Sequence, residues 1–323
     1  MKTVINMTTS SYDMERFKNR EDFLGFIHGF DGVELMCFDG DNDCNHYVTS
    51  SEVVGLHMSS FPTWIDLWRG NYDALLKEFD NWDNVEQYYG STTKDAIVKR
   101  FRRDLENVHK YKAEYCVFHI SEATVEEGFT LNYRCSDEET IDAAAEIINE
   151  VFAEEDGNVA LLMENLWQPG LSLTNPAMTK RLLDKVKYPN KGIMMDTGHL
   201  FHTNTAIKSQ EEGINYIHMI LDNHGELTRY FRGVHLNQSI TGEFCEKQRK
   251  NPPPMADTFQ ERITQMFVNA FLVDKHQPFT GKGIKELLNR INPEFCNWEF
   301  ITESREQHQS YLDAQCLALD YER

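Results

Sequence analysis

The sequence of 323 residues lacks several features that would assign it to a common class. Its seven cysteines are an odd number without a CxxC pair, which argues against a disulfide framework and against zinc held by cysteine. Residues 1–17 are too polar for a signal peptide. No apolar run approaches the roughly 18 residues of a membrane helix. We therefore expect a cytoplasmic protein with reduced, buried thiols and no membrane partner.

Basic residues are also scarce. The chain has 32 Lys and Arg against 52 Asp and Glu, and its formal net charge is −20. Such a charge repels a phosphate backbone, so nucleic acid is a poor candidate partner. The nearest basic cluster, residues 246–250, is short and mixed in sign. Because repeats, low-complexity tracts and linkers are absent from the sequence, we predict a single domain over residues 1–323.

Apolar, strand-like runs alternate with amphipathic, helix-like segments along the chain. The predicted strands are 3–7, 33–38, 53–58, 115–120, 159–164, 192–196, 233–236 and 297–301. The predicted helices are 21–30, 94–112, 141–152, 178–186, 211–222, 283–291 and a closing helix from 305 to about 319. Eight strands that mostly alternate with helices predict an α/β fold, the (β/α)8 TIM barrel. A doubly wound, dinucleotide-binding sheet would need a glycine-rich turn after its first strand, and residues 8–11 contain no glycine.

Two segments are longer than such a barrel requires. Residues 59 to about 91 follow the third predicted strand, and residues 237 to about 273 follow the seventh. We expect long loops there, because long loops of compact domains often act as lids or binding loops. The first of them carries Trp64 and Trp68. Together with Trp167, these side chains could stack on sugar faces or simply pack against the barrel rim.

Nine histidine and carboxylate side chains stand at or just after the ends of short apolar runs. In a parallel barrel the carboxyl ends of the strands surround the mouth of the active site. Ionisable residues at such positions are rarely buried without a partner. The pattern therefore predicts a metal enzyme. The nine residues are His57, His119, Glu164, Asp196, His199, His235, Asp274, His276 and Glu299.

Four of the nine form an inner group, because they end four consecutive predicted strands. Neighbouring strands lie about 4.8 Å apart, so these side chains can converge on one ion. Three carboxylates and one imidazole suit Mn²⁺, Mg²⁺, Co²⁺ or Zn²⁺. The inner group is Glu164, Asp196, His235 and Glu299.

The other five residues flank this group. His57 and His119 could hold a second ion that Glu164 bridges, and His199, Asp274 and His276 could hold a third. Each also has a simpler interpretation as a helix cap, a surface turn or a hydrogen-bond donor behind the ligands. The remaining histidines do not follow a predicted strand, so we expect structural or exposed roles for His28, His46, His109, His202, His218, His224 and His308.

In this order, the motifs resemble the xylose isomerase-like barrel superfamily, which contains sugar isomerases and epimerases and the endonuclease IV branch. The resemblance runs from the first predicted strand to Glu299. It is carried by Gly32-Val33-Glu34-Leu35, Leu56-His57-Met58-Ser59, Phe118-His119, Met163-Glu164-Asn165, Met195-Asp196-Thr197-Gly198-His199, Val234-His235-Leu236-Asn237, Trp298-Glu299, and Asp274-Lys275-His276 followed by Gly281-Lys282-Gly283-Ile284.

The resemblance implies that the inner group is the metal site shared by both branches and that the other five residues match the zinc cluster of the endonuclease IV branch. It implies an isomerase or epimerase that moves a proton on a small sugar, sugar phosphate or polyol through a metal-bound enediolate. Glu164 and Glu299 would exchange the proton, and His199 would act on substrate oxygens. The expected substrate contacts are Trp64, Trp68, Trp167 and Asn165.

The alternative is an endonuclease IV-like, multinuclear zinc phosphoester hydrolase, which would use all nine residues. Two observations argue against DNA as the substrate of such an enzyme. The net charge is strongly negative, and the basic and aromatic loops that nuclease relatives press into DNA have no counterpart in the sequence. The stretch of roughly 38 residues between His235 and Asp274 is also longer than such an enzyme leads us to expect, and Gln238 stands where the superfamily usually has Asp. Barrels of this kind often associate through their helices, so a homo-oligomer is possible.

Overall fold

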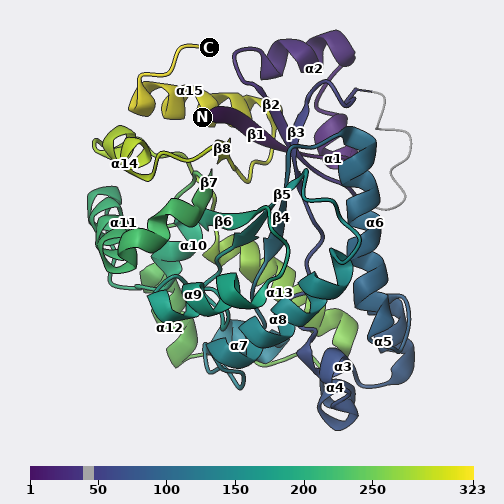
Figure 1. Cartoon of the computed structure of the whole chain (residues 1–323). Helices are drawn as coiled ribbons and strands as arrows, with labels where there is room; N and C mark the ends of the chain where they lie inside the picture. Colours follow the sequence, from purple (N-terminus) through teal and green to yellow (C-terminus); the bar gives the residue numbers. More distant parts are fainter. Residues whose placement is uncertain (39–46) are drawn as a thin grey trace.

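The computed structural model describes residues 1–38 and 47–323; Cys44 and His46 lie outside these ranges. Within the described residues, eight parallel strands pair in chain order and close into a barrel through β1 and β8, with helices around it (Figure 1). This confirms the predicted (β/α)8 barrel. The strands are β1 (Lys2–Thr8), β2 (Gly32–Met36), β3 (Val53–His57), β4 (Tyr115–His119), β5 (Ala160–Glu164), β6 (Lys191–Asp196), β7 (Phe231–His235) and β8 (Phe295–Trp298).

Most strand bounds agree with the predicted ranges to within about two residues, and β8 differs at both ends. It begins at Phe295 and ends at Trp298, whereas the predicted range is 297–301. The apolar run Phe295–Trp298 is buried and pairs with β1 and β7. Glu299 therefore follows the strand instead of lying within it, which places its carboxylate at the barrel mouth.

Helices lie in the connections between most of the strands and around the outside of the barrel (Figure 1); between β2 and β3 the described residues form none. Seven of them correspond to predicted ones: α2 (Arg20–Ile27), α6 (Asp95–Tyr111), α8 (Asp137–Val151), α9 (Pro176–Lys185), α11 (Gln210–His224), α14 (Ile284–Ile291) and α15 (Arg305–Leu319). Four short elements were not predicted: α1 (Ser11–Met14), α7 (Val125–Thr130), α10 (Thr197–His202) and the 3-10 helix η2 (Gly225–Tyr230).

The two long loops expected after the third and seventh strands are largely helical, which corrects the sequence-based expectation. The first contains α3 (Ile65–Arg69), α4 (Tyr72–Phe79) and α5 (Trp82–Tyr89), which lie together at the lower right of Figure 1. The second contains α12 (Gly242–Lys250) and α13 (Phe259–Val273), both of which contact α7.

Side-chain caps fix the starts of two of these helices, α5 and α13. The Asn81 side chain accepts a hydrogen bond from the Asn84 amide at the start of α5, and Thr258 and Glu261 form a reciprocal capping box at the start of α13. Such caps satisfy amide groups that a helix start would otherwise leave unpaired. The insertions therefore form a helical rim on the barrel.

Apolar side chains fill the lower part of the barrel interior. Tyr115 is fully buried there, and its ring packs on Phe295 with centroids 4.4 Å apart. The ring needs Gly55 beside it, because a Cβ at that position would lie 2.1 Å from the Tyr115 Cζ atom. This packed layer closes the barrel beneath the polar residues at the carboxyl ends of the strands.

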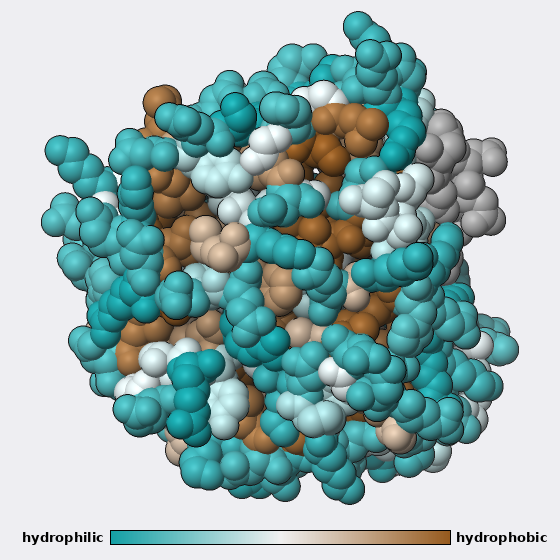
Figure 2. Space-filling model, turned by 45° about the horizontal axis from the view of Figure 1, so that its top comes forward, coloured by the Kyte–Doolittle hydropathy of each residue, from teal (hydrophilic) through white to brown (hydrophobic). Residues whose placement is uncertain are grey.

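Hydrophilic side chains cover much of the face shown in Figure 2, with apolar patches between them. None of the helices in residues 1–38 and 47–323 combines the length and the apolar character needed to cross a bilayer. The cysteines of these residues form no disulfide, and Cys116, Cys245 and Cys296 are buried. These three thiols therefore belong to the packed interior, whereas Cys37, Cys135 and Cys316 are only partly buried, so the expectation of buried thiols holds for half of the described cysteines.

Candidate metal centre

The alternation of side chains along each strand brings the predicted ligands into the barrel. Leu162 belongs to the apolar cluster inside the barrel, and Glu164 follows it by two residues. Val117 and His119 have the same relationship in β4. Because residues i and i+2 of a strand share a face, the last inward-facing position of each strand lies at the barrel mouth.

The four inner residues converge as the sequence predicted. Their possible ligand atoms all lie within 4.8 Å of one another; the set is Glu164, Asp196, His235 and Glu299. The His235 Nδ1 atom is central, because it lies 3.2 Å from Glu164 Oε1, 3.1 Å from Glu299 Oε2 and 3.9 Å from Asp196 Oδ2. Three carboxylates therefore lie close to one imidazole nitrogen.

A second group forms around the other oxygen of Glu164. His57 Nε2 lies 3.3 Å from Glu164 Oε2, and His119 Nε2 lies 3.1 Å from the same oxygen. The two imidazole nitrogens are 3.1 Å apart. The His57 Nδ1 atom faces the Met58 carbonyl oxygen at 2.8 Å, which leaves Nε2 to face Glu164. Glu164 thus has one oxygen in the inner group and one between the two histidines.

A third group surrounds Asp274. Its Oδ2 atom lies 3.0 Å from His199 Nε2 and 2.7 Å from His276 Nε2. His276 has a φ of 42°, in the left-handed region that side chains other than glycine rarely adopt. Its other nitrogen, Nδ1, lies 3.4 Å from Glu299 Oε2 and so connects this group to the inner one. The structure therefore brings all nine predicted residues into one cluster.

Polar contacts behind the cluster fix Asp196 and His199. Asp196 ends β6 and caps α10: its Oδ1 atom accepts a hydrogen bond from the His199 amide at 2.6 Å. Both amide atoms of Asn165 bond to the backbone of Asp196, and Asn237 Nδ2 donates to Asp196 Oδ2 at 2.8 Å. Gly198 allows this packing, because a Cβ there would lie 1.9 Å from Asn237 Oδ1.

Within the cluster, burial and neighbouring charges shift the pKa of each group in opposite directions. Burial raises the pKa of Glu164, but His235 and His119 lower it, and the net pKa is well below the usual range. Burial lowers the pKa of His235, but Glu299, Glu34 and Glu164 raise it, and the net pKa is well above the usual range. Glu299, beside His235 and His276, has its pKa lowered to about 2. The geometry therefore favours anionic Glu164 and Glu299, whereas burial, with these two carboxylates nearby, raises the pKa of Asp196 to about 7.

These residues fit a bound divalent cation. Within the described part of the chain, three buried atoms of the cluster have no hydrogen-bond partner: Glu164 Oε2, His276 Nδ1 and Glu299 Oε2. Buried polar atoms are normally paired, and a cation would satisfy all three. Carboxylate oxygens and imidazole nitrogens are donors that zinc, manganese and related ions accept. Because the donor atoms form three neighbouring groups, the cluster has room for more than one ion.

A family model described as a xylose isomerase-like TIM barrel matches residues 28–317. The chain belongs to this family. A search of curated proteins finds no match.

Solved structures with the same fold extend over the whole length of the chain at low sequence identity. The zinc-binding IOLI protein matches with a TM-score of 0.55 and 12% identity, covering 100% of this chain and 99% of that one. Endonuclease IV from Thermus thermophilus matches with a TM-score of 0.54 and 13% identity, and a D-psicose 3-epimerase with 0.51 and 14%; each covers 99% of both chains. At these identities the likeness establishes the fold alone.

The aromatic residues expected to contact substrate in this xylose isomerase-like barrel lie in different surroundings. Trp167 is half-buried beside the cluster, with its ring centroid 5.3 Å from that of His199. Trp64 and Trp68 are buried, and their indole N–H groups donate to the Ser121 carbonyl oxygen and to Glu146 Oε2, each at 2.8 Å. Of the three, Trp167 therefore has the geometry for a ligand contact.

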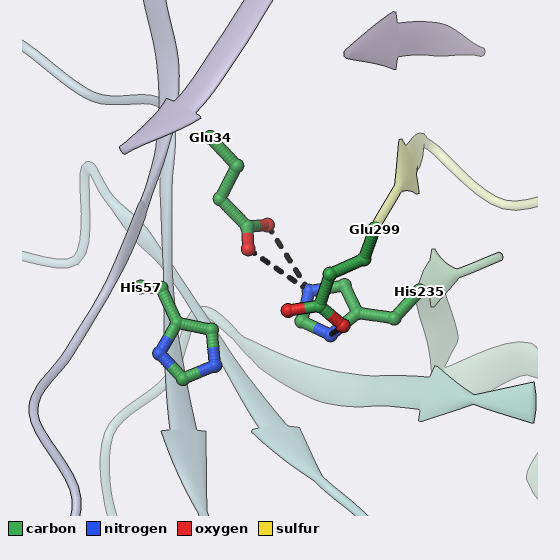
Figure 3. Close-up of side chains that lie close together, drawn as sticks. All are labelled: Glu34, His57, His235 and Glu299. Atoms are coloured by element: carbon green, nitrogen blue, oxygen red, sulfur yellow. Dashed lines mark hydrogen bonds and ion pairs between the residues drawn. The ribbon is translucent and has the colours of Figure 1, made fainter. Parts of the chain in front are cut away.

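Sequence reasoning missed Glu34 as a member of the site. Its carboxylate reaches the far nitrogen of His235, with Oε1 3.0 Å from Nε2 (Figure 3). Asn297 Nδ2 donates to Glu34 Oε1 at 2.9 Å, and the Tyr115 hydroxyl donates to Oε2 at 2.7 Å. A carboxylate inside the apolar run Gly32–Met36 was the available sign, because a buried charge needs partners.

His202 was expected to be structural or exposed, and it also lies beside the cluster. Its Nε2 atom is 3.3 Å from Asp274 Oδ1, and its residue is buried on α10. It follows His199 by three residues, so both can face the same side of that helix. Because α10 was not predicted, nothing in the sequence pattern placed His202 near the other ligands.

Proposed function

We propose that the protein is a divalent-metal-dependent enzyme that isomerises or epimerises a small sugar or polyol by proton transfer. The observation that carries this proposal is the approach of Glu164 and Glu299 to the same His235 nitrogen, with Asp196 completing the group. Membership of the xylose isomerase-like family supports it, and a D-psicose 3-epimerase shares the fold.

The metal would be held by the inner four residues, Glu164, Asp196, His235 and Glu299. When bound, a divalent cation would polarise a substrate carbonyl and acidify the adjacent C–H group. One of the two glutamates would remove that proton, and the same or the other glutamate would return it. A general base must be unprotonated, and the lowered pKa keeps both glutamates anionic; it also weakens their basicity, because a base works best with a pKa near the working pH.

Other side chains would orient the substrate. His199 would act on a substrate oxygen, although its Nδ1 atom already faces the Asn165 carbonyl oxygen at 2.9 Å and its Nε2 atom faces Asp274. Trp167 would present an aromatic face to a sugar ring. Asn165 would act indirectly, because its amide holds the backbone of Asp196.

Variants of the two glutamates test this proposal. Purified Glu164→Gln and Glu299→Gln proteins should lose turnover on any ketose or aldose that the wild type converts, while circular dichroism shows an unchanged fold. Glu52→Gln is the matched control, since Glu52 is a buried glutamate that Arg20 pairs with at 2.8 Å outside the cluster. Substantial turnover in either cluster variant would contradict the proton-transfer roles.

A multinuclear zinc phosphoester hydrolase is the second candidate, and the arrangement around Glu164 favours it. The two oxygens of Glu164 face different groups, one the His235 nitrogen and the other His57 and His119. Such a bridging carboxylate is what a two-metal hydrolase requires. Asp274 and its histidines would then hold a third ion. The nine-residue cluster thus supports this candidate more strongly than the sequence did.

Metal content per chain, measured by elemental analysis on protein purified without chelator, separates the two candidates. One equivalent of a divalent metal per chain supports the isomerase, and two or three equivalents of zinc per chain support the hydrolase. Asp274→Asn provides a second measurement. In an isomerase, the variant should keep most of its activity and its single equivalent; in the hydrolase, it should lose both activity and about one equivalent.

A further inference from the structure

The helix α13 of the second insertion packs against its own chain along one side. The buried and half-buried residues of that side recur every three or four positions: Phe259, Arg262, Met266, Asn269 and Val273. This spacing places them on one face of a helix. Asn269 Nδ2 donates to the Gly128 carbonyl oxygen of α7 at 3.3 Å, and the Phe259 ring lies 4.4 Å from the Phe79 ring of α4, centroid to centroid. This face therefore attaches α13 to the helical rim.

The opposite face of α13 is apolar and exposed. Four residues at helical spacing form it, and each is between 44% and 56% exposed: Phe267, Val268, Phe271 and Leu272. We call these four residues the α13 face. The chain contains no charged residue from Ile263 to Val273, although 26% of the whole sequence is charged. Exposed helix faces normally carry polar and charged residues, so a continuous apolar face indicates a partner.

The size of the α13 face suits the pairing of two identical chains. Four side chains of this size at about half exposure present roughly 350 Å² of apolar surface, and two copies would bury roughly 700 Å². A small stable interface buries about 1,200 Å², of which about 65% is apolar in homodimers. Two α13 faces therefore supply most of the apolar contact that a dimer needs.

Charge favours a second copy of the chain over other partners. The net charge of −20 opposes binding to an anionic membrane surface. The single basic residue of α13, Arg262, pairs with Asp80 at 2.6 Å, whereas helices that lie on membranes are rich in lysine and arginine. A basic protein would be drawn to the acidic surface of the chain and not to a face without charge. An identical chain is equally acidic, so two copies repel each other least where both are uncharged.

The α13 face is also compatible with two-fold symmetry, the commonest symmetry of protein dimers. When two such helices pack antiparallel about an axis near the middle of the apolar run, the phenylalanines of one helix meet those of the other. We infer that the protein forms a homodimer in which the α13 faces of two chains pack against each other. This dimer is independent of the proposed metal chemistry, because no residue of the α13 face belongs to the metal centre.

Sedimentation velocity of the full-length, metal-containing protein tests the dimer. The wild type should sediment as a dimer at about 50 µM. Phe271→Glu should raise the dissociation constant at least about 100-fold, because a carboxylate would be buried against the apolar helix of the other chain. Phe271 is more than half exposed, so circular dichroism should show an unchanged fold. Leu317→Glu is the matched control: it places a carboxylate at an apolar side chain that is 82% exposed on α15, and it should dimerise like the wild type.

Salt provides a second measurement. Screening reduces the repulsion between two acidic chains, so raising NaCl from about 20 to about 300 mM should tighten the dimer, whereas an association held by ion pairs would weaken. The inference is overturned if salt weakens the dimer, if Phe267→Glu and Phe271→Glu both dimerise like the wild type, or if Leu317→Glu dissociates to the same extent. A wild type that stays monomeric at about 200 µM also overturns it; binding of that monomer to phosphatidylcholine vesicles would identify the α13 face as a membrane contact instead.

Discussion

Glu34 orients His235 in the metal centre. The carboxylate lies against Nε2 of the imidazole, and Nδ1 faces Glu164 and Glu299, so an ion at Nδ1 would leave Nε2 as the protonated nitrogen that donates to Glu34. Carboxylates behind histidine ligands commonly fix the tautomer and strengthen the ligand. The Tyr115 hydroxyl and Asn297 amide hold Glu34 in turn, so the orientation is anchored in the packed barrel interior.

The variant Glu34→Gln should weaken metal binding by about 10- to 100-fold, the usual effect of removing such a partner. The amide keeps the size of the side chain but loses the negative charge that supports the His235 proton. Metal titration followed by calorimetry would measure the effect, with Glu52→Gln as the control outside the cluster. An unchanged affinity in Glu34→Gln would show that His235 is oriented by other contacts.

The buried His308 should make the stability of the fold depend on pH. It is 4% exposed, packs its ring on Phe26 at 5.1 Å, and has an Nε2 atom without a partner in the described residues. Burial, with Arg16 and Arg323 nearby, lowers its pKa from 6.5 to about 3. The unfolded chain therefore binds a proton below pH 6.5 that the folded chain excludes, so stability falls as pH falls from 6.5 toward 3.

Urea unfolding between about pH 6.5 and 5 would measure this dependence. His308→Phe keeps an aromatic ring and removes the titration, so the loss of stability on acidification should be smaller by about 1 kcal/mol per pH unit. His28→Gln removes an exposed histidine and should keep the wild-type slope. Equal slopes in wild type and His308→Phe would mean that other groups control the acid response.

At the level of single residues, the sequence identified side chains at or just after the ends of apolar runs and missed Glu34 and His202, which stand elsewhere. Glu164 and His235 end their strands, so the strand pattern alone places them at the mouth. Glu34 lies within β2, and its role depends on Tyr115, 81 residues away. His202 depends on a helix of six residues whose cap is Asp196 itself. Such contacts form only when the chain is folded.

At the scale of elements, one arginine connects the insertion after β3 to the segment after β4. Arg134 pairs with Asp66 of α3, with Glu122 at 2.8 Å and with Glu127 of α7 at 3.6 Å. Glu122 is fully buried at its side chain and accepts the Trp64 amide at 2.7 Å. The sequence analysis did not predict α3 or α7, because both helices are short; for α7 the capping pair Thr124 and Glu127 was the available sign.

Removing this cation should destabilise the protein. Arg134→Met removes the cation beside the buried Glu122. Burial raises the pKa of Glu122 to about 8, so this carboxyl can bind a proton, and we expect the free energy of unfolding to fall by about 2 kcal/mol. Arg69→Met is the control: Arg69 pairs with Glu146 at 2.7 Å, but both side chains are nearly half exposed, so its loss should cost less than about 1 kcal/mol. Denaturant unfolding would compare the two, and equal effects would contradict a structural role for Arg134.

At the scale of the whole molecule, closure of the barrel assembles the centre. The nine candidate ligands lie between residues 57 and 299, and helical connections separate the strands of this range. The sequence predicted this fold because eight apolar runs alternate with helices, and it predicted the inner ligands because parallel strands end on the same side. It could not predict the number of ions, which depends on small differences in the distances between donors.

Removal of the metal should therefore lower the stability of the whole fold. Ligands from β3 to β8 meet in one cluster, so a cation bound there joins elements across the barrel and stabilises the folded chain by mass action. At a free metal concentration of about 100 times the Kd, the gain in stability is about 2.7 kcal/mol, or roughly 4 °C in Tm for a chain of this size.

Dialysis against chelator should lower Tm by about that amount, and added Zn²⁺ or Mn²⁺ should restore it. In Asp196→Asn, which weakens the inner group, the same treatment should shift Tm much less. An identical Tm before and after chelation, with the metal shown by elemental analysis to be gone, would mean that the barrel holds the cluster together through its histidine–carboxylate pairs alone.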